Sequence, residues 1–167
     1  MTEQTEHAAL MAFLRAQRQS VLAIVEGLGG DRIRQVTVPS GWTPLGMIEH
    51  LAHAERFWFQ QVLTGRAAAL PWPPADAGNN QGGPFVTAHQ QEEVLSFYRQ
   101  QCAASDEVLA STSLTAAPSG NVPADLAGEM HAVRDIVLHM IEETARHAGH
   151  LDIARELIDG STGLGAR

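Results

Sequence analysis

A long helical segment near the C-terminus carries residue types that can bind a metal ion. The stretch HMIEETARHAGHLDIARELIDG, residues 139–160, combines histidines with several acids. Within it, Glu143 and His147 are four residues apart, which places their side chains one turn apart on the same side of a helix. Imidazole and carboxylate suit borderline divalent ions such as Zn, Ni or Fe(II). The spacing therefore lets one helix offer two ligands to one ion.

A third ligand has to come from another helix. In the segment GWTPLGMIEHLAHAERFWFQQVLTG, residues 41–65, His50 lies at the boundary of the apolar face. On the C-terminal helix, His147 falls within the apolar face and Glu143 at its boundary, given a rotation of about 100° per residue. A bundle can thus bring the three side chains together. Three protein ligands with an open fourth position is the arrangement of catalytic zinc sites.

A solvated helix face explains part of the same pattern. A histidine four residues from an acid is also a common surface pair, so His139, Glu143 and His150 fit a solvated flank as well. By helical phase, His53 points to the polar side of its helix, together with Glu49 and Arg56. Three histidines are expected to be solvated or structural: His53, His89 and His131.

Other reactive or aromatic residues are interpreted as structural. Cys102 is expected to be a small core residue rather than a nucleophile, because no basic partner lies near it in the sequence. Phe57 and Trp58 are expected in the core rather than in a stacking platform. Trp42 is expected to pack beside the start of the helix that carries His50, and to anchor the chain there.

Composition excludes several classes of function. The chain has 167 residues, of which 44% are hydrophobic, so we expect one domain over residues 1–167. The formal net charge of −8 argues against binding to nucleic acid or to an acidic membrane surface. A single cysteine excludes an intrachain disulfide. With no signal-peptide pattern and no apolar run near the roughly 20 residues that span a bilayer, a cytoplasmic location is expected.

The apolar periodicity predicts an all-α fold, an antiparallel four-helix bundle. The four helices are expected at about residues 7–28, 43–65, 87–111 and 129–158. Thr43 and Thr87 are the expected N-caps, and Gly160 the C-terminal boundary. The segment 66–87 is rich in Pro, Gly, Asn and Ala and is expected to be a long loop, of the kind that often forms a lid or pocket wall. No convincing strand pattern is present.

Together, the two histidine-bearing motifs resemble the DinB/YfiT-like metalloenzyme superfamily, which includes mycothiol and bacillithiol transferases. Its members are four-helix bundles with a metal triad between helices. The family pattern has a Trp just before the second helix and a ligand His a short stretch after that Trp, and Trp42 and His50 match these positions. Two further ligands lie four residues apart on the last helix, matched by Glu143 and His147. The resemblance covers most of the chain and selects the same three residues as the helical phase.

The match departs from the family at two places. Many relatives have His where this chain has Glu143, and Glu here resembles the mycothiol-dependent maleylpyruvate isomerase branch. The second ligand is commonly followed by Arg-Gly-Gln; here Gly149 is kept, while Ala148 and His150 replace Arg and Gln. His150 can therefore contact a ligand, replace one, or accept a proton, which makes it the candidate catalytic residue.

The resemblance implies a metal-dependent thiol S-transferase. In that scheme His50, Glu143 and His147 bind a divalent ion (Zn, Ni or Fe), and the cation favours the thiolate of a small thiol, with mycothiol expected in an actinobacterial host. The thiolate attacks a small-molecule electrophile, and the loop 66–87 helps to select it.

Three alternatives stay open. One is a maleylpyruvate-isomerase-like activity, although those isomerases carry an additional C-terminal domain. Another is a non-catalytic, metal-binding stress-response protein. A hydrolytic metalloenzyme is also compatible with the ligands. A homodimer fits the bundle, but the sequence does not identify its face.

Overall fold

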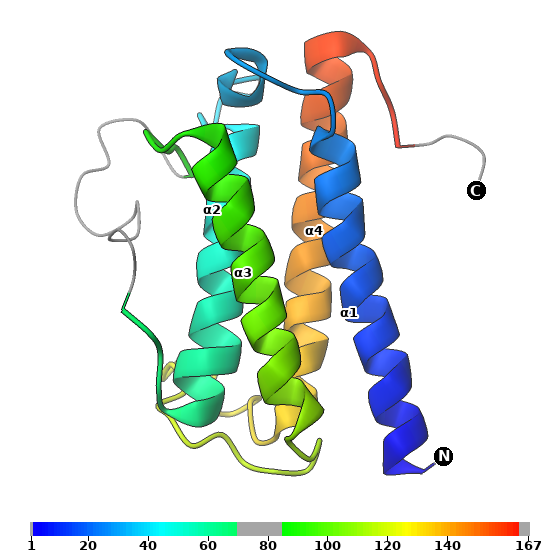
Figure 1. Ribbon diagram of the computed structural model, residues 1–167, viewed down its shortest axis with the longest axis vertical. Coiled ribbons are helices and arrows are strands. Elements are labelled where there is room, and N and C mark those ends of the chain that lie inside the picture. The colour runs from blue at the N-terminus through cyan, green and yellow to red at the C-terminus, as the bar shows by residue number, and fades with distance from the viewer. Residues whose placement is uncertain (1, 70–84, 164–167) are drawn as a thin grey trace.

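Four long helices form a bundle in the computed structural model, which describes residues 2–69 and 85–163 (Figure 1). The long helices are α1 (Glu3–Val25), α2 (Pro44–Glu55), α3 (Gln91–Ala110) and α4 (Val133–Asp159). A short 3-10 helix, η1 (Arg32–Arg34), precedes α2, and a π-helical segment, η2 (Arg56–Val62), continues it. No strand is present in these ranges. The prediction of an all-α helical bundle is confirmed.

Helices α1 and α4 are parallel neighbours. Near their starts, the Arg134 guanidinium of α4 donates to the Glu6 carboxylate of α1 at 2.5 Å. Near their ends, Arg155 of α4 donates to the backbone carbonyl of Ile24 at 2.6 Å. These contacts fix α1 and α4 in one register along their whole length (Figure 1).

Helix α3 is the parallel neighbour of α2. The ring of Phe97 lies 5.2 Å from that of His53, and further along both helices the Gln60 amide donates to Gln101 at 2.8 Å. The antiparallel relation therefore holds between the two pairs, with α1 and α4 opposite in direction to α2 and α3 (Figure 1). A tight turn cannot join parallel neighbours, which explains the length of the connection 63–90. Most of the predicted loop 66–87 lies outside the described residues.

The start of α2 follows the predicted capping. The Thr43 hydroxyl accepts the backbone N–H of Gly46 at 3.1 Å, and Pro44 occupies the first helical turn. Gly65, with a φ of +70°, ends the helical run as predicted. The π-helical segment before it was not predicted. Such segments are rare and have no reliable sequence signal.

Two helices begin later than predicted. Helix α3 starts at Gln91 rather than at Thr87, because the Thr87 hydroxyl caps a local turn by accepting the N–H of His89 at 3.1 Å. The backbone N–H of Gln90 instead donates to the carboxylate of Glu93 at 2.9 Å, which fixes the helix start one turn further on.

Helix α4 starts at Val133 rather than at about Glu129. The Asp135 carboxylate accepts the backbone N–H of Ala132 at 2.9 Å, and the N–H of Val133 donates to the carbonyl of Ala116 at 2.9 Å. These contacts satisfy amides of the first turn that have no partner within the helix. The helix therefore begins where a distant loop supplies its acceptor.

Helix α1 is shifted towards the N-terminus. It begins at Glu3, where the Thr2 hydroxyl accepts the N–H of Thr5 at 3.2 Å, and it ends at Val25 rather than at Leu28. Gly27, with a φ of +77°, turns the chain away before the predicted end of the helix at residue 28.

The core divides into two clusters stacked along the bundle. One packs around Trp42, Leu45 and Ile48 near the start of α2, and the other around Trp58 and Phe59 of η2. The prediction that Trp58 is a core residue is confirmed, while Phe57 is only partly buried and packs at the edge. The first cluster includes apolar residues of both α2 and α4, so these two helices pack against each other at this level.

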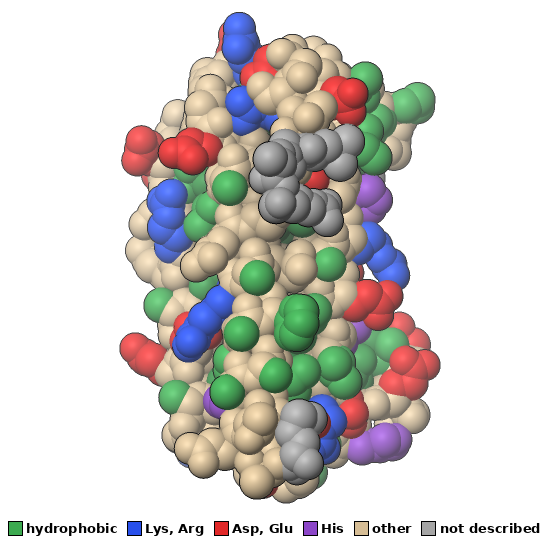
Figure 2. Space-filling model, turned by 90° about the vertical axis from the view of Figure 1, so that its right-hand side faces the viewer, with side chains coloured by type: hydrophobic (Ala, Val, Ile, Leu, Met, Phe, Trp, Pro, Cys, Tyr) green, Lys and Arg blue, Asp and Glu red, His purple; other side chains and the backbone are tan. Residues whose placement is uncertain are grey.

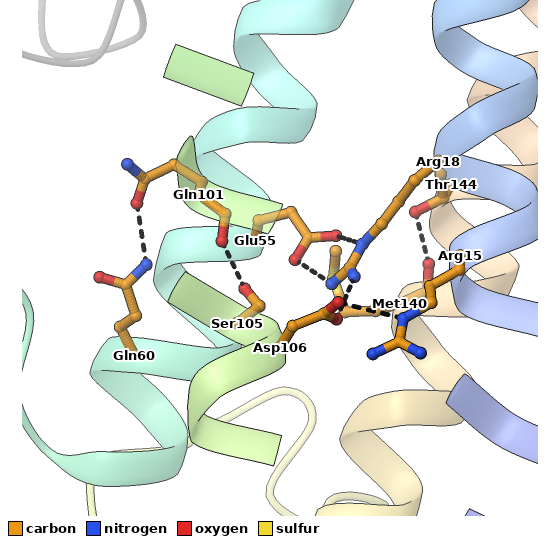
Figure 3. Close-up of polar contacts among 9 residues, drawn as sticks. All are labelled: Arg15, Arg18, Glu55, Gln60, Gln101, Ser105, Asp106, Met140 and Thr144. Atoms are coloured by element: carbon orange, nitrogen blue, oxygen red, sulfur yellow. Dashed lines mark hydrogen bonds and ion pairs between the residues drawn. The ribbon is translucent and has the colours of Figure 1, made fainter. Parts of the chain in front are cut away.

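A buried ion pair ties three helices together. Arg18 of α1 donates to both carboxylate oxygens of Glu55, at 2.7 and 2.6 Å, and to Asp106 of α3 at 2.8 Å (Figure 3). Both Arg18 and Glu55 are buried. Cys102 lies partly buried beside this group, as predicted for a core residue. Burial, together with the charge of Glu55, raises the pKa of Cys102 to about 12.

The surface mixes charges of both signs. Figure 2 shows acidic and basic side chains interspersed on the α1 side of the molecule, with hydrophobic side chains scattered between them. Phe13 of α1 and Leu138 of α4 are among the exposed large hydrophobic residues. Within residues 2–69 and 85–163, none of the helices combines the length and apolar character that crossing a membrane requires.

Candidate metal centre

Three side chains from α2 and α4 meet in the bundle. His50 Nε2 lies 3.0 Å from Glu143 Oε1, and His147 Nε2 lies 3.0 Å from the same oxygen. One ligand atom from each of the three residues lies within 4.8 Å of the others. The sequence singled out these three residues, and the structure brings them together. The contact spans two helices that are far apart in the chain.

The triad is buried on one side and accessible on the other. His147 is 7% exposed, whereas the side chains of His50 and Glu143 are 24% and 21% exposed. The α4 pair follows from the i,i+4 spacing, and His50 is reached because α2 packs against α4 at this level. A small molecule can therefore approach the triad from the side of His50 and Glu143.

Glu143 is ionised in this environment. Hydrogen bonds from His147 and then from His50 hold the pKa of the Glu143 carboxyl well below its usual range, and they outweigh the opposite effect of burial. An ionised carboxylate can only accept hydrogen bonds, so both imidazoles carry a proton on Nε2 in the metal-free state.

The donor set suits a divalent cation. Two imidazole nitrogens and one carboxylate oxygen are ligands of borderline ions, and they supply one negative charge. The atoms that hydrogen-bond to one another in the metal-free protein are those that a cation would share. The residues therefore fit a metal ion of this class.

His150 lies beside the triad rather than in it. Its Nδ1 is 3.2 Å from the Nδ1 of His147, and its ring is exposed. Partial burial, followed by the charges of His147 and Arg146, lowers the pKa of His150. At neutral pH this imidazole is therefore uncharged and can accept or donate one hydrogen bond through Nδ1.

The expectation for Glu49 and His53 was wrong in part. Glu49 is 1% exposed rather than solvated, because its side of α2 is covered by the segment leading into α3. Its Oε1 lies 3.7 Å from Nε2 of His53 and 3.9 Å from Nε2 of His89. His53 also packs on Phe97. His53 and His89 thus have structural contacts, on the side of α2 that is covered by the segment leading into α3.

Three other residues singled out in the sequence lie outside the triad. His139 packs against the Trp58 ring at 4.6 Å and is not part of the triad. His131 is exposed, with Nε2 2.9 Å from the carbonyl of Gly128. Trp42 is buried beside the start of α2, as expected, and its ring lies 6.1 Å from that of His150.

Sequence reasoning missed one residue at the site. The Phe85 ring lies 4.3 Å from the His50 ring and 5.8 Å from the His147 ring. Phe85 falls inside the predicted loop 66–87, but helical phase says nothing about a residue outside a helix. The one signal in the sequence was the expectation that the loop 66–87 forms a lid or pocket wall.

Comparison with known proteins identifies the family. A family model described as Mycothiol-S-transferase matches residues 9–160. No match was found among the curated proteins or among the solved structures. The matched range includes all four long helices except the first residues of α1, and it contains the whole triad. This confirms the resemblance seen in the two histidine motifs: the chain belongs to the mycothiol S-transferase family.

Proposed function

We propose that the protein is a metal-dependent mycothiol S-transferase whose divalent cation is bound by His50, Glu143 and His147. The observation that carries the proposal is the meeting of these three ligand atoms, within 4.8 Å, in a chain of this family. A cation there would stabilise the thiolate of a bound thiol over the thiol and so activate its sulfur. Zn, Ni and Fe(II) all suit the donor set.

The side chains around the triad have distinct tasks. Glu143 supplies the negative charge that attracts a cation. Binding through Nε2 requires each histidine to give up its Nε2 proton. In His147 the proton then resides on Nδ1, which can donate to the Nδ1 of His150, 3.2 Å away. This hydrogen bond fixes the tautomer and the ring orientation of His147.

The same contact favours one of the three roles considered for His150, the contact with a ligand. If its Nδ1 accepts from His147, the neutral His150 ring carries its own proton on Nε2. It is then a donor towards solvent and not a base. We therefore assign His150 as a positioning residue for His147, and the thiol proton leaves to solvent or to a second substrate.

The proposed reaction forms a bond between the thiol sulfur and an electrophilic carbon. Where the electrophile carries a leaving group, that group departs with its bonding electron pair. The accessible side of the triad, at His50 and Glu143, is where both small molecules would enter. The segment 66–87 would help to select the electrophile.

Thiol-dependent consumption of an electrophile tests the proposal. Purified untagged protein, freed of metal and reloaded with Zn²⁺, is incubated with mycothiol and a panel of electrophiles such as chlorodinitrobenzene. We expect conversion that needs both thiol and metal and that His147→Ala abolishes. His131→Ala, an exposed histidine outside the triad, is the matched control and should retain activity. Absence of any thiol dependence in the wild type across the panel would sink the proposal.

We also propose that residues 1–167 form a single domain, that the protein is cytoplasmic, and that it forms a homodimer. The homodimer is tested by sedimentation equilibrium of the purified protein, in which a monomer mass at micromolar concentration would refute it.

A further inference from the structure

Phe85 has an unusual backbone conformation next to the triad. Its φ of +54° lies in the left-handed region, which a residue with a large side chain rarely adopts. Such conformations persist only where surrounding contacts enforce them, and they gather at functional sites.

The first turn of α2 is built to receive the Phe85 carbonyl. That oxygen accepts the backbone N–H of Thr43 at 3.2 Å and the Thr43 hydroxyl at 3.4 Å. A Cβ added to Gly46 would lie 1.7 Å from the same oxygen, so only glycine fits there. Phe85 is thus held against α2 one turn before His50.

A second anchor holds the residues that follow. The Arg34 guanidinium donates to the carbonyl of Thr87 at 2.8 Å and also to the carbonyl of His89. Arg34 belongs to η1, which packs at the same end of the bundle. The chain is therefore held at Phe85 itself and at two of the residues that follow it, Thr87 and His89.

Among the three triad side chains, His50 is the one whose orientation we expect to rely most on the Phe85 ring. His147 is buried and has His150 beside it, and Glu143 contacts both histidines. The ring of His50 contacts Glu143, His147 and Phe85. If Nε2 of His50 binds a cation, its hydrogen bond to Glu143 is given up. The contact between the Phe85 and His50 rings, with centroids 4.3 Å apart and planes at 46°, does not depend on that bond.

We propose that Phe85 is a positioning residue for His50: anchored to the first turn of α2, its ring holds the imidazole in the orientation that cation binding requires. This inference rests on the proposed function, since it assumes that His50 is a ligand. It adds a residue outside the four helices to the proposed centre. It also gives Gly46 and Thr43 a second role, beyond helix formation, in holding Phe85.

The test measures Zn²⁺ affinity by competition with a chromophoric chelator, and the absorption spectrum of the Co²⁺-loaded protein. Removal of a partner that orients a ligand typically weakens metal binding about 10- to 100-fold. We expect a loss of at least about 10-fold in Phe85→Ala and Phe85→Leu, together with altered Co²⁺ bands. Phe85→Tyr keeps a ring and should restore both. Phe13→Ala, an exposed phenylalanine of α1, is the control.

The outcomes separate this inference from the proposed function. If the wild type binds Zn²⁺ while Phe85→Ala and Phe85→Leu bind equally well with an unchanged Co²⁺ spectrum, Phe85 does not position His50 and the metal centre stands. If the wild type binds no Zn²⁺, the proposed function fails, and this inference fails with it. Circular dichroism verifies folding, and Phe85→Leu decides the matter if Phe85→Ala does not fold.

A backbone variant tests the anchor independently. Gly46→Ala should weaken Zn²⁺ binding in the same way as Phe85→Ala, because the new methyl group displaces the Phe85 carbonyl. Gly149→Ala is the matched control, since it is also a helical glycine but a Cβ there meets nothing within 4 Å. Equal Zn²⁺ affinity of Gly46→Ala and Gly149→Ala would show that the first turn of α2 does not hold Phe85 in place.

Discussion

Glu143 accepts hydrogen bonds from two histidines through one oxygen, and this arrangement decides how the site responds to protons and to metal. In the metal-free protein both imidazoles place a proton on Nε2 towards the carboxylate. A cation needs the same nitrogens unprotonated. In His147 the proton can move to Nδ1, where His150 lies 3.2 Å away. Metal binding and proton position are therefore linked at this site.

The low pKa of Glu143 predicts a pH dependence of the free energy of unfolding. Its folded pKa lies below the ordinary 4.5, so the carboxylate stabilises the metal-free fold above about pH 4.5 and loses this effect as the pH falls towards the folded value. Glu143→Gln removes this contribution. The difference in free energy of unfolding between wild type and variant should shrink below pH 4.5. Urea unfolding from pH 7 to 3 checks this, and a constant difference would contradict it.

His150 should act through His147 and not as a base. His150→Ala removes the acceptor beside His147 Nδ1 and should weaken Zn²⁺ binding about 10- to 100-fold. His150→Gln should recover most of that loss, because an amide oxygen can also accept the Nδ1 proton. Zn²⁺ competition titrations compare the two variants. An alanine variant with wild-type affinity would remove His150 from the centre.

Cys102 is predicted to be chemically inert in the folded protein. Its pKa of about 12 leaves almost no thiolate at pH 8. Iodoacetamide should therefore modify Cys102 slowly in native protein and rapidly in urea, and Cys102→Ser should keep the transferase activity. Mass spectrometry of timed samples measures the modification. Rapid labelling of the native protein at pH 8 would show that the thiol is accessible and reactive.

At the scale of residues, sequence reasoning works where a helix imposes the geometry. The spacing of Glu143 and His147 is sufficient to place them together, and the helical boundary position of His50 points it in the right direction. Phe85 could not be found in this way, because its position depends on a backbone turn and on the missing Cβ of Gly46. Glu49 was misjudged because phase within one helix does not tell which neighbouring segment covers it.

At the scale of elements, the Arg18–Glu55 pair holds α1 against α2 and, through Asp106, against α3 (Figure 3). Breaking a buried pair leaves one charge uncompensated, which costs about 3–5 kcal/mol, whereas apolar replacement of both partners is often neutral. We therefore expect Arg18→Met and Glu55→Met to be strongly destabilised singly and the double variant to recover much of the loss.

Urea unfolding measures these effects against a surface control. Arg146 and Glu142 form an exposed i,i+4 pair at 2.7 Å on α4, with side-chain exposures of 60% and 69%. Such pairs contribute little, so Arg146→Met should change the free energy of unfolding by no more than about 0.5 kcal/mol. If Arg18→Met costs no more than Arg146→Met, the buried pair does not hold the helices together.

Element boundaries show where local sequence signals stop being sufficient. Thr43 caps α2 as predicted, because the cap and the first turn are adjacent in the chain. The starts of α3 and α4 were misplaced by about one turn. The amide of Val133 finds its acceptor at Ala116, a contact that depends on tertiary structure. Thr87 is a good capping residue that caps a turn instead.

At the scale of the whole molecule, the apolar pattern predicts four helices and a bundle, and both are present in the described chain. The pattern could not predict that α1 lies parallel to α4 and α2 parallel to α3. A helix with one apolar face can pack in either direction, and the direction is decided by connection lengths and by contacts such as Arg134 with Glu6. This arrangement brings α2 and α4 together at the triad.

A cation at the triad would join the two parallel pairs of helices. His50 belongs to one pair and His147 to the other, so binding is coupled to the packing of the whole bundle. Binding to the folded state alone raises the free energy of unfolding by about 4.1 kcal/mol at a ligand concentration 1,000 times the Kd. The metal, if bound, is therefore a structural link as well as the centre of the proposed reaction.

Calorimetric titration of Zn²⁺ into untagged, metal-free protein tests the central claim most directly. The proposed centre predicts one Zn²⁺ per chain in the wild type, with strongly weakened binding in His50→Ala, Glu143→Gln and His147→Ala and unchanged binding in His131→Ala. No Zn²⁺ binding by the wild type, or equal binding by the wild type and His147→Ala, would contradict it.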